Sequence, residues 1–217
     1  GNVWQVNRRE PGVATWFAST VGGLIAFGFI AALDTRTGAP APVYVAQNIG
    51  SFLLALGVLV GVLEFRGHRR GRGGRPLALL AIGFTAVMLA LRDDVRARLL
   101  VFDAASIPVM VGLAVALAGK APAEERRSLR FGAIGPLGIA VVLLVRLHDT
   151  ATAPVDAVVP DPSIQNAIFL MTALFNIVMT HTATIVLYSR AQARTERLAM
   201  EDSLTGLVNR RAFEERL

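Results

Sequence analysis

Cysteine is absent from the 217-residue chain, which excludes disulfide bonds and thiolate metal sites. Lysine occurs once, at Lys120, in a connection between apolar segments, so no lysine is placed to form a retinal Schiff base inside a membrane span. Of the three histidines, His148 and His181 would lie about 25 Å apart along the predicted helices, which argues against a bis-histidine haem. The carboxylates and histidines also lack metal-ligand spacing, so the sequence predicts neither a metal site nor a resident cofactor.

Charged residues are also scarce, at 18%, whereas 53% of the residues are hydrophobic and the mean hydropathy is +0.53. This is a membrane-protein composition, since about a quarter of the residues in a soluble domain are charged. A helix needs about 17 to 25 apolar residues to cross a bilayer. The sequence therefore predicts an all-α, polytopic bundle of six transmembrane helices, at approximately Val13–Leu33, Val43–Leu63, Pro76–Leu91, Leu99–Ala118, Phe131–Leu147 and Ile164–Leu187. The third and fifth of these runs are short.

The basic residues alternate between the connections of these runs. Eleven lie in residues 1–12, 64–75 and 119–130, and only four in the alternate connections, which include Arg92, Arg96 and Arg98. Because cytoplasmic loops concentrate Lys and Arg, both termini are expected in the cytoplasm, as in a multi-pass protein of a bacterial inner membrane. The net charge of +6 is thus interpreted as a signal of membrane topology. The expected partner of the chain is the lipid bilayer, and no nucleic-acid partner is expected. With no basic and apolar leader after Gly1, we expect no cleaved signal peptide, and a chain that begins within a longer protein.

Polar residues within apolar runs are costly and usually face the bundle interior or a cavity. Most of those in this chain fall in the half of the predicted bundle that faces away from the cytoplasm. We therefore hypothesise an outward-opening pocket for a small apolar or amphipathic ligand, with Asp103 and Arg146 as its charged pair and Gln47, Asn48 and Asn166 as hydrogen-bonding partners. The alternative is a polar network that only holds the helices together.

Small residues indicate where helices approach closely. Gly57 and Gly61 form a G-x-x-x-G pattern, and Gly132, Gly135 and Gly138 follow one another in the fifth run. Such patterns favour close helix packing, and less strongly dimerisation.

The sixth run continues into "YSRAQARTERLAMED", which lacks Gly and Pro and is expected to remain helical up to residue 201. Leu187, Ala191, Arg194 and Leu198 follow one another at spacings of four, three and four, as in a short heptad seam with one polar break. This spacing is compatible with a parallel homodimer or with a single exposed helix. Asp202 and the residues after it favour a turn, and Asn209 is a suitable N-cap for a further helix from Arg210.

The stretch Asp202-Ser-Leu-Thr-Gly-Leu-Val-Asn-Arg-Arg-Ala-Phe213 resembles the D-x-L-T-G-L-x-N-R-R-x-F opening of a GGDEF domain. The resemblance implies a membrane-bound diguanylate cyclase, which condenses two GTP into cyclic di-GMP with Mg²⁺ between two catalytic domains. It covers about the last twenty residues and none of the family's catalytic ones, so no activity of this chain by itself is expected. In the family the opening turn joins a signalling helix to the catalytic domain, and its Asp commonly pairs with an Arg of N-R-R. Here the matching residues are Asp202 with Arg210 or Arg211.

The sequence therefore divides into a sensor bundle at residues 1–187, a cytoplasmic signalling helix at 188–201 and the start of a truncated GGDEF domain at 202–217. The predicted function is transmembrane signal input to a diguanylate cyclase through the sixth helix. The residues expected to relay the signal are Leu187, Ala191, Leu198, Asp202, Asn209, Arg210 and Arg211. The alternative is a small transporter or channel-like bundle with an incidental tail, and mainly the motif at Asp202–Phe213 argues against it.

Overall fold

The computed structural model describes residues 12–23, 25, 41–67, 70–154 and 162–200. These residues are helical apart from short connections, and no strand occurs among them. An unlabelled helix at 13–23 is followed by α3 (Ala41–Phe65), α4 (Arg70–Ala90), α5 (Val95–Ala118), α6 (Ala123–Gly132), α7 (Ile134–Thr152) and α8 (Pro162–Met200). The predicted all-helical fold class is confirmed for this part of the chain.

Four helical stretches are long and apolar enough to cross a membrane, namely Pro42–Phe65, Val95–Ala118, Ala123–Thr152 and Asn166–Glu196. This finding supports a membrane protein. The apolar part of α4, Arg75–Ala90, is shorter. The first predicted run, Val13–Leu33, lies partly outside the described residues, so the count of six spans stays a prediction.

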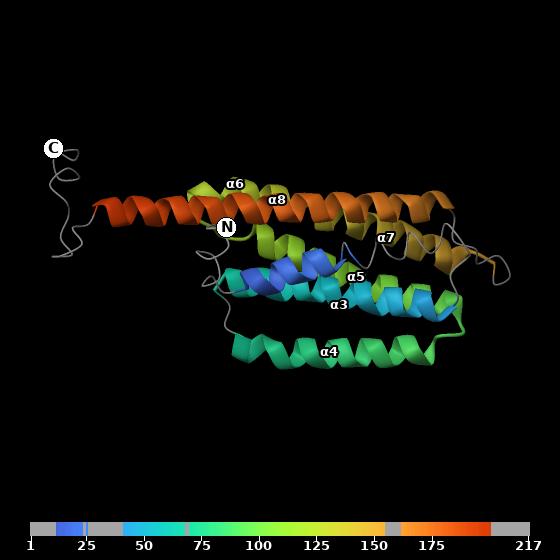
Figure 1. The fold of residues 1–217 in the computed structure, drawn as a ribbon. Coiled ribbons are helices and arrows are strands. Elements are labelled where there is room, and N and C mark those ends of the chain that lie inside the picture. The colour runs from blue at the N-terminus through green and yellow to red at the C-terminus, as the bar shows by residue number, and fades with distance from the viewer. Residues whose placement is uncertain (1–11, 24, 26–40, 68–69, 155–161, 201–217) are drawn as a thin grey trace.

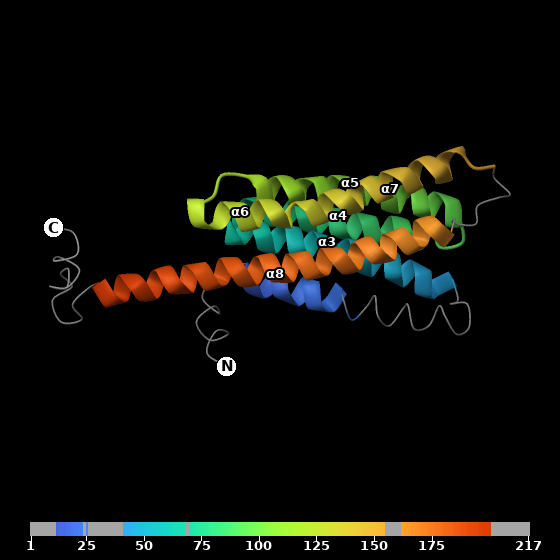
Figure 2. The ribbon, with the colours of Figure 1, turned by 90° about the horizontal axis from the view of Figure 1, so that it is seen from above.

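The helices lie side by side along one long axis (Figures 1 and 2). α5 packs on α3 and α7, while α8 packs on α6 and α7. α4 lies at the edge of the bundle, mainly against α3. α8, with 39 residues, is the longest of the labelled helices, and its last turns extend beyond the others in both views.

Local chemistry sets the helix boundaries that matter for the site. The carboxylate of Asp94 accepts a hydrogen bond from the Ala97 backbone N–H at 2.9 Å and so caps the start of α5. The chain breaks between α6 and α7 at Ala133, three residues before Pro136. Pro136 has no N–H to bond with the Gly132 carbonyl, which accounts for the interruption near the start of the predicted run Phe131–Leu147. α6 lies mostly within residues 119–130, which the sequence interpretation counted as a connection.

The core and the outer surface of the bundle are both apolar. Phe52 and Met88 are fully buried, and the rings of Phe52 and Phe84 stack with their centroids 3.9 Å apart. In contrast Leu79, Ile82, Val115, Val141, Leu170 and Ile177 are each at least 60% exposed. Because soluble proteins rarely expose so much contiguous apolar surface, these side chains are suited to contact lipid.

Glycines allow several helices to approach closely. A Cβ on Gly61 would lie 2.5 Å from the Trp16 backbone nitrogen, and one on Gly57 would collide with the Ser19 Oγ. A Cβ on Gly132 would similarly meet the Thr182 side chain at 2.9 Å. The close packing expected from these glycines therefore occurs within the chain, between α3 and the helix at 13–23 and between α6 and α8.

Candidate functional site

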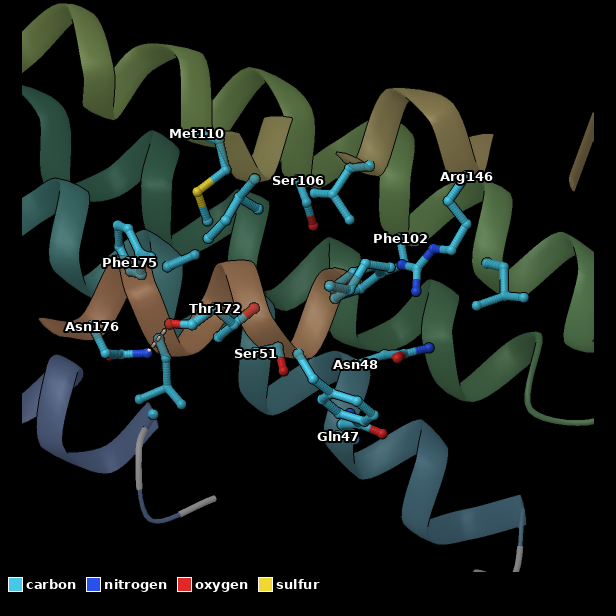
Figure 3. A pocket seen from close by; sticks show the side chains of 18 of the residues that line it. Gln47, Asn48, Ser51, Phe102, Ser106, Met110, Arg146, Thr172, Phe175 and Asn176 are labelled. Carbon is cyan, nitrogen blue, oxygen red and sulfur yellow. Dashed lines mark hydrogen bonds between the residues drawn. The ribbon is translucent and has the colours of Figure 1, made fainter. Parts of the chain in front are cut away.

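A cavity of about 710 Å³ lies between the helix at 13–23, α3, α5, α7 and α8 (Figure 3). This volume is within the range of about 300 to 1,000 Å³ that is usual for small-molecule sites. Arg146, Asn48 and Gln47 lie towards one end of the cavity, while Met110, Phe175 and Asn176 lie towards the other (Figure 3). The cavity thus has a polar end and a mainly apolar end.

Four of the five residues predicted for the pocket line this cavity. Gln47 and Asn48 project from α3, Arg146 from α7 and Asn166 from α8. The fifth, Asp103 on α5, does not line it but lies behind Arg146. The structure therefore brings the predicted set together, with Asp103 as a buried partner of one lining residue.

Asp103 and Arg146 form a bidentate ion pair between α5 and α7. Arg146 Nε donates to Asp103 Oδ2 at 2.9 Å, and Arg146 Nη2 donates to Oδ1 at 2.5 Å. The side chains of Asp103 and Arg146 are 0% and 8% exposed, and the guanidinium lies 5.5 Å from the centre of the Phe102 ring. Two parallel charge-assisted hydrogen bonds fix the guanidinium plane, so Arg146 is held in one orientation at the cavity wall.

Arg98 is a lining residue that the sequence interpretation missed, because it was counted with the loop cations. The structure places it in the first turn of α5, 4% exposed, where it lines the cavity. Its Nη1 donates to the Arg92 carbonyl at 2.7 Å, while its buried Nε has no hydrogen-bond partner among the described residues. Asp94 is a favourable N-cap residue, and a helix predicted to begin directly after it, rather than at Leu99, would have included Arg98.

The inner part of the cavity is mainly apolar, with two polar additions from α8. Thr172 and Asn176 line it next to Phe175, and Asn176 Nδ2 donates to the Thr172 carbonyl at 2.8 Å. Asn176 lies ten residues after Asn166 on α8, yet both residues line the same cavity. Ser106 on α5 also lines it, and its buried Oγ lacks a partner among the described residues.

A second ion pair ties α8 to α6 well beyond the cavity. Arg190 Nε and Nη2 donate to Glu125 Oε1 and Oε2 at 2.7 and 3.0 Å. The Arg190 guanidinium also lies 3.8 Å from the centre of the Phe65 ring at the end of α3. Three helices therefore meet at Arg190, on the same helix that contributes Asn166 and Asn176 to the cavity.

The residues predicted to relay a signal are only partly described. Leu187 packs against the core and Ala191 is half-buried, both on α8, which continues without interruption to Met200. The side chain of Leu198 and the residues Asp202, Asn209, Arg210 and Arg211 lie outside what the structure describes.

Across residues 12–23, 25, 41–67, 70–154 and 162–200, no group of three His, Asp or Glu side chains could hold a metal ion. Comparison with known proteins found no matching family model, no similar curated protein and no similar solved structure.

Proposed function

We propose that the chain is the signal-input module of a membrane-bound diguanylate cyclase. In this proposal six helices cross a bacterial inner membrane with both termini in the cytoplasm. A small apolar or amphipathic ligand occupies the outer half of the bundle, and α8 carries the response to paired GGDEF domains in a parallel homodimer. Mg²⁺ and GTP belong to those catalytic domains, and no residue of this chain is proposed to bind them.

The observation that carries the proposal is that a single helix, α8, both lines the cavity and leads to the GGDEF-like motif. α8 contributes Asn166, Thr172 and Asn176 to the cavity wall and then continues to Met200, two residues before the GGDEF-like motif. A ligand that fits one position of α8 better than another would bias that helix, because a ligand shifts an equilibrium by its differential affinity for the two states. The Arg190–Glu125 ion pair lies between the cavity and the motif and would be affected by any such shift.

The test fuses residues 1–201 to an active GGDEF domain and measures cyclic di-GMP in cells. Thr172→Trp inserts an indole into the cavity, whereas Ala173→Trp places the same group on the exposed side of α8. Filling the cavity should change output about 5- to 150-fold in either direction, the usual range of coupling between sites. Ala173→Trp should leave the output within about twofold of the unsubstituted fusion, well below that coupling range.

A folded Thr172→Trp fusion with unchanged output would overturn the proposal, because the cavity would then not be coupled to α8. The fold of each variant is checked by its melting temperature and by its amount in the membrane fraction.

A further inference from the structure

The cavity is lined by a buried positive charge that has no ion pair among the described residues. Two guanidinium groups line it, those of Arg98 and Arg146, and the Arg146 charge is balanced by the carboxylate of Asp103. No carboxylate of a described residue forms an ion pair with Arg98. Asp94, one turn earlier, attracts Arg98 electrostatically, but it is exposed, forms no ion pair with Arg98 and accepts the Ala97 N–H. A buried charge without a partner is unfavourable, so a partner from outside the chain would stabilise it.

The hydrogen bonds of Arg98 leave part of its guanidinium without an acceptor from the protein. Nη1 is used by the Arg92 carbonyl, whereas Nε and Nη2 have no acceptor among the described residues. Nε is itself fully buried, whereas Nη2 is not among the fully buried atoms. A carboxylate in the cavity could therefore meet the Arg98 guanidinium through Nη2 in a charge-assisted hydrogen bond.

The rest of the cavity is suited to an apolar chain attached to that carboxylate. Arg98, Phe102, Ser106 and Met110 follow one another every four residues on α5 and line the cavity as one stripe. From Arg98 to Met110 the stripe is about 18 Å long at 1.5 Å per residue. The opposite walls add Val58, Leu143 and Phe175, all of them buried. The cavity is therefore long, apolar and cationic at one end.

We propose that the cavity binds a single-chain amphiphilic carboxylate, such as a fatty acid, with its head group on the guanidinium of Arg98 and its chain directed towards Met110 and Phe175. This assignment rests on the proposed receptor function, since it names the ligand class of the same cavity. One chain is favoured over a two-chain lipid by the single stripe and by the single lining guanidinium without an ion pair among the described residues.

The test measures saturable binding of radiolabelled decanoate to the chain in nanodiscs of uncharged lipid. Decanol and decyltrimethylammonium, with the same chain length, serve as competitors. Decanoate should bind with one site per chain, and neither competitor should displace it at equal concentration. Arg98→Gln should weaken decanoate binding about 10- to 100-fold, the effect expected for a lost hydrogen-bonded charge pair. Arg98→Lys should retain part of the affinity, because it keeps the charge but loses the planar guanidinium.

Two further variants identify the cause of any change. Arg92→Gln removes an exposed charge near the same end of the bundle, keeps the backbone carbonyl that Arg98 uses, and should leave binding unchanged. Asp103→Asn removes the carboxylate that balances Arg146, which makes this end of the cavity more positive, and should strengthen decanoate binding.

Displacement of decanoate by decanol, or full affinity in a folded Arg98→Gln variant, would overturn the carboxylate assignment. These outcomes leave the receptor proposal intact if Thr172→Trp still changes the output of the cyclase fusion. Conversely, decanoate binding that depends on Arg98 together with an output insensitive to Thr172→Trp supports the carboxylate site and refutes the receptor function.

Discussion

Replacing Asp103 and replacing Arg146 should destabilise the protein to different extents, because the two side chains lie differently relative to the cavity. Removing one partner of a buried ion pair costs about 3 to 5 kcal/mol, because the other charge stays buried and unpaired. At about 2 to 4 °C per kcal/mol for a chain of this size, the melting temperature would fall by roughly 6 to 20 °C. Asp103 is 0% exposed and does not line the cavity, whereas Arg146 does. Arg146→Gln, which strands the carboxylate, should therefore be more damaging than Asp103→Asn, which leaves a cation beside the cavity.

The assay is thermal unfolding in detergent, followed by circular dichroism of the helices, for both single variants and the double variant. The double variant should recover most of the loss, because neutral replacements for a buried pair are often tolerated. An exposed control pair is provided by Arg92 and Asp93, which are 72% and 85% exposed and should contribute less than about 1 kcal/mol. If the two single losses simply add in the double variant, or if Asp103→Asn is the more damaging change, the reasoning is wrong.

Two further substitutions test the packing that holds the cavity walls. Gly61→Leu would collide with the helix at 13–23 and should cost about 1 to 3 kcal/mol, whereas Gly50→Leu on the same α3, where a Cβ would meet nothing within 4 Å, should change the melting temperature little. Glu125→Gln removes the charge from the ion pair to α8 and should cost about 1 kcal/mol, since that pair is partly exposed, while Glu124→Gln at the exposed neighbouring position should be neutral. Equal effects of a variant and its matched control would contradict the corresponding contact.

The grouping of the polar residues could be predicted because an apolar run makes each polar residue in it conspicuous. A charge such as Asp103 within a long apolar run must find a partner on another helix, and Arg146 was the available cation at a similar depth. The position of each polar residue along its apolar run gives its depth in the membrane. Depth was therefore enough to predict that Gln47, Asn48 and Asn166 lie at the same end of the bundle.

Arg98 could not be found in that way, because hydropathy fixes helix ends poorly when a long cationic side chain lies at the boundary. The cavity itself was also beyond the reach of the sequence, since it depends on how each helix is rotated about its own axis and on how far apart α3 and α8 are held. The same holds for the Arg190–Glu125 pair, which joins residues 65 positions apart through the packing of α6 on α8.

α7 and α8, which both line the cavity, differ in stiffness. α7 is separated from α6 by a break at Ala133, and Pro136 leaves a carbonyl without its helical hydrogen bond, so this joint lacks one of the backbone bonds that stiffen a continuous helix. After Pro162, α8 contains neither proline nor glycine through its 39 residues, a rod of about 58 Å. An expansion of the cavity would therefore be absorbed as a bend at the α6–α7 joint, while α8 would shift as one unbent piece. A small displacement beside Asn166 would then reach Met200 without being lost in deformation along the way.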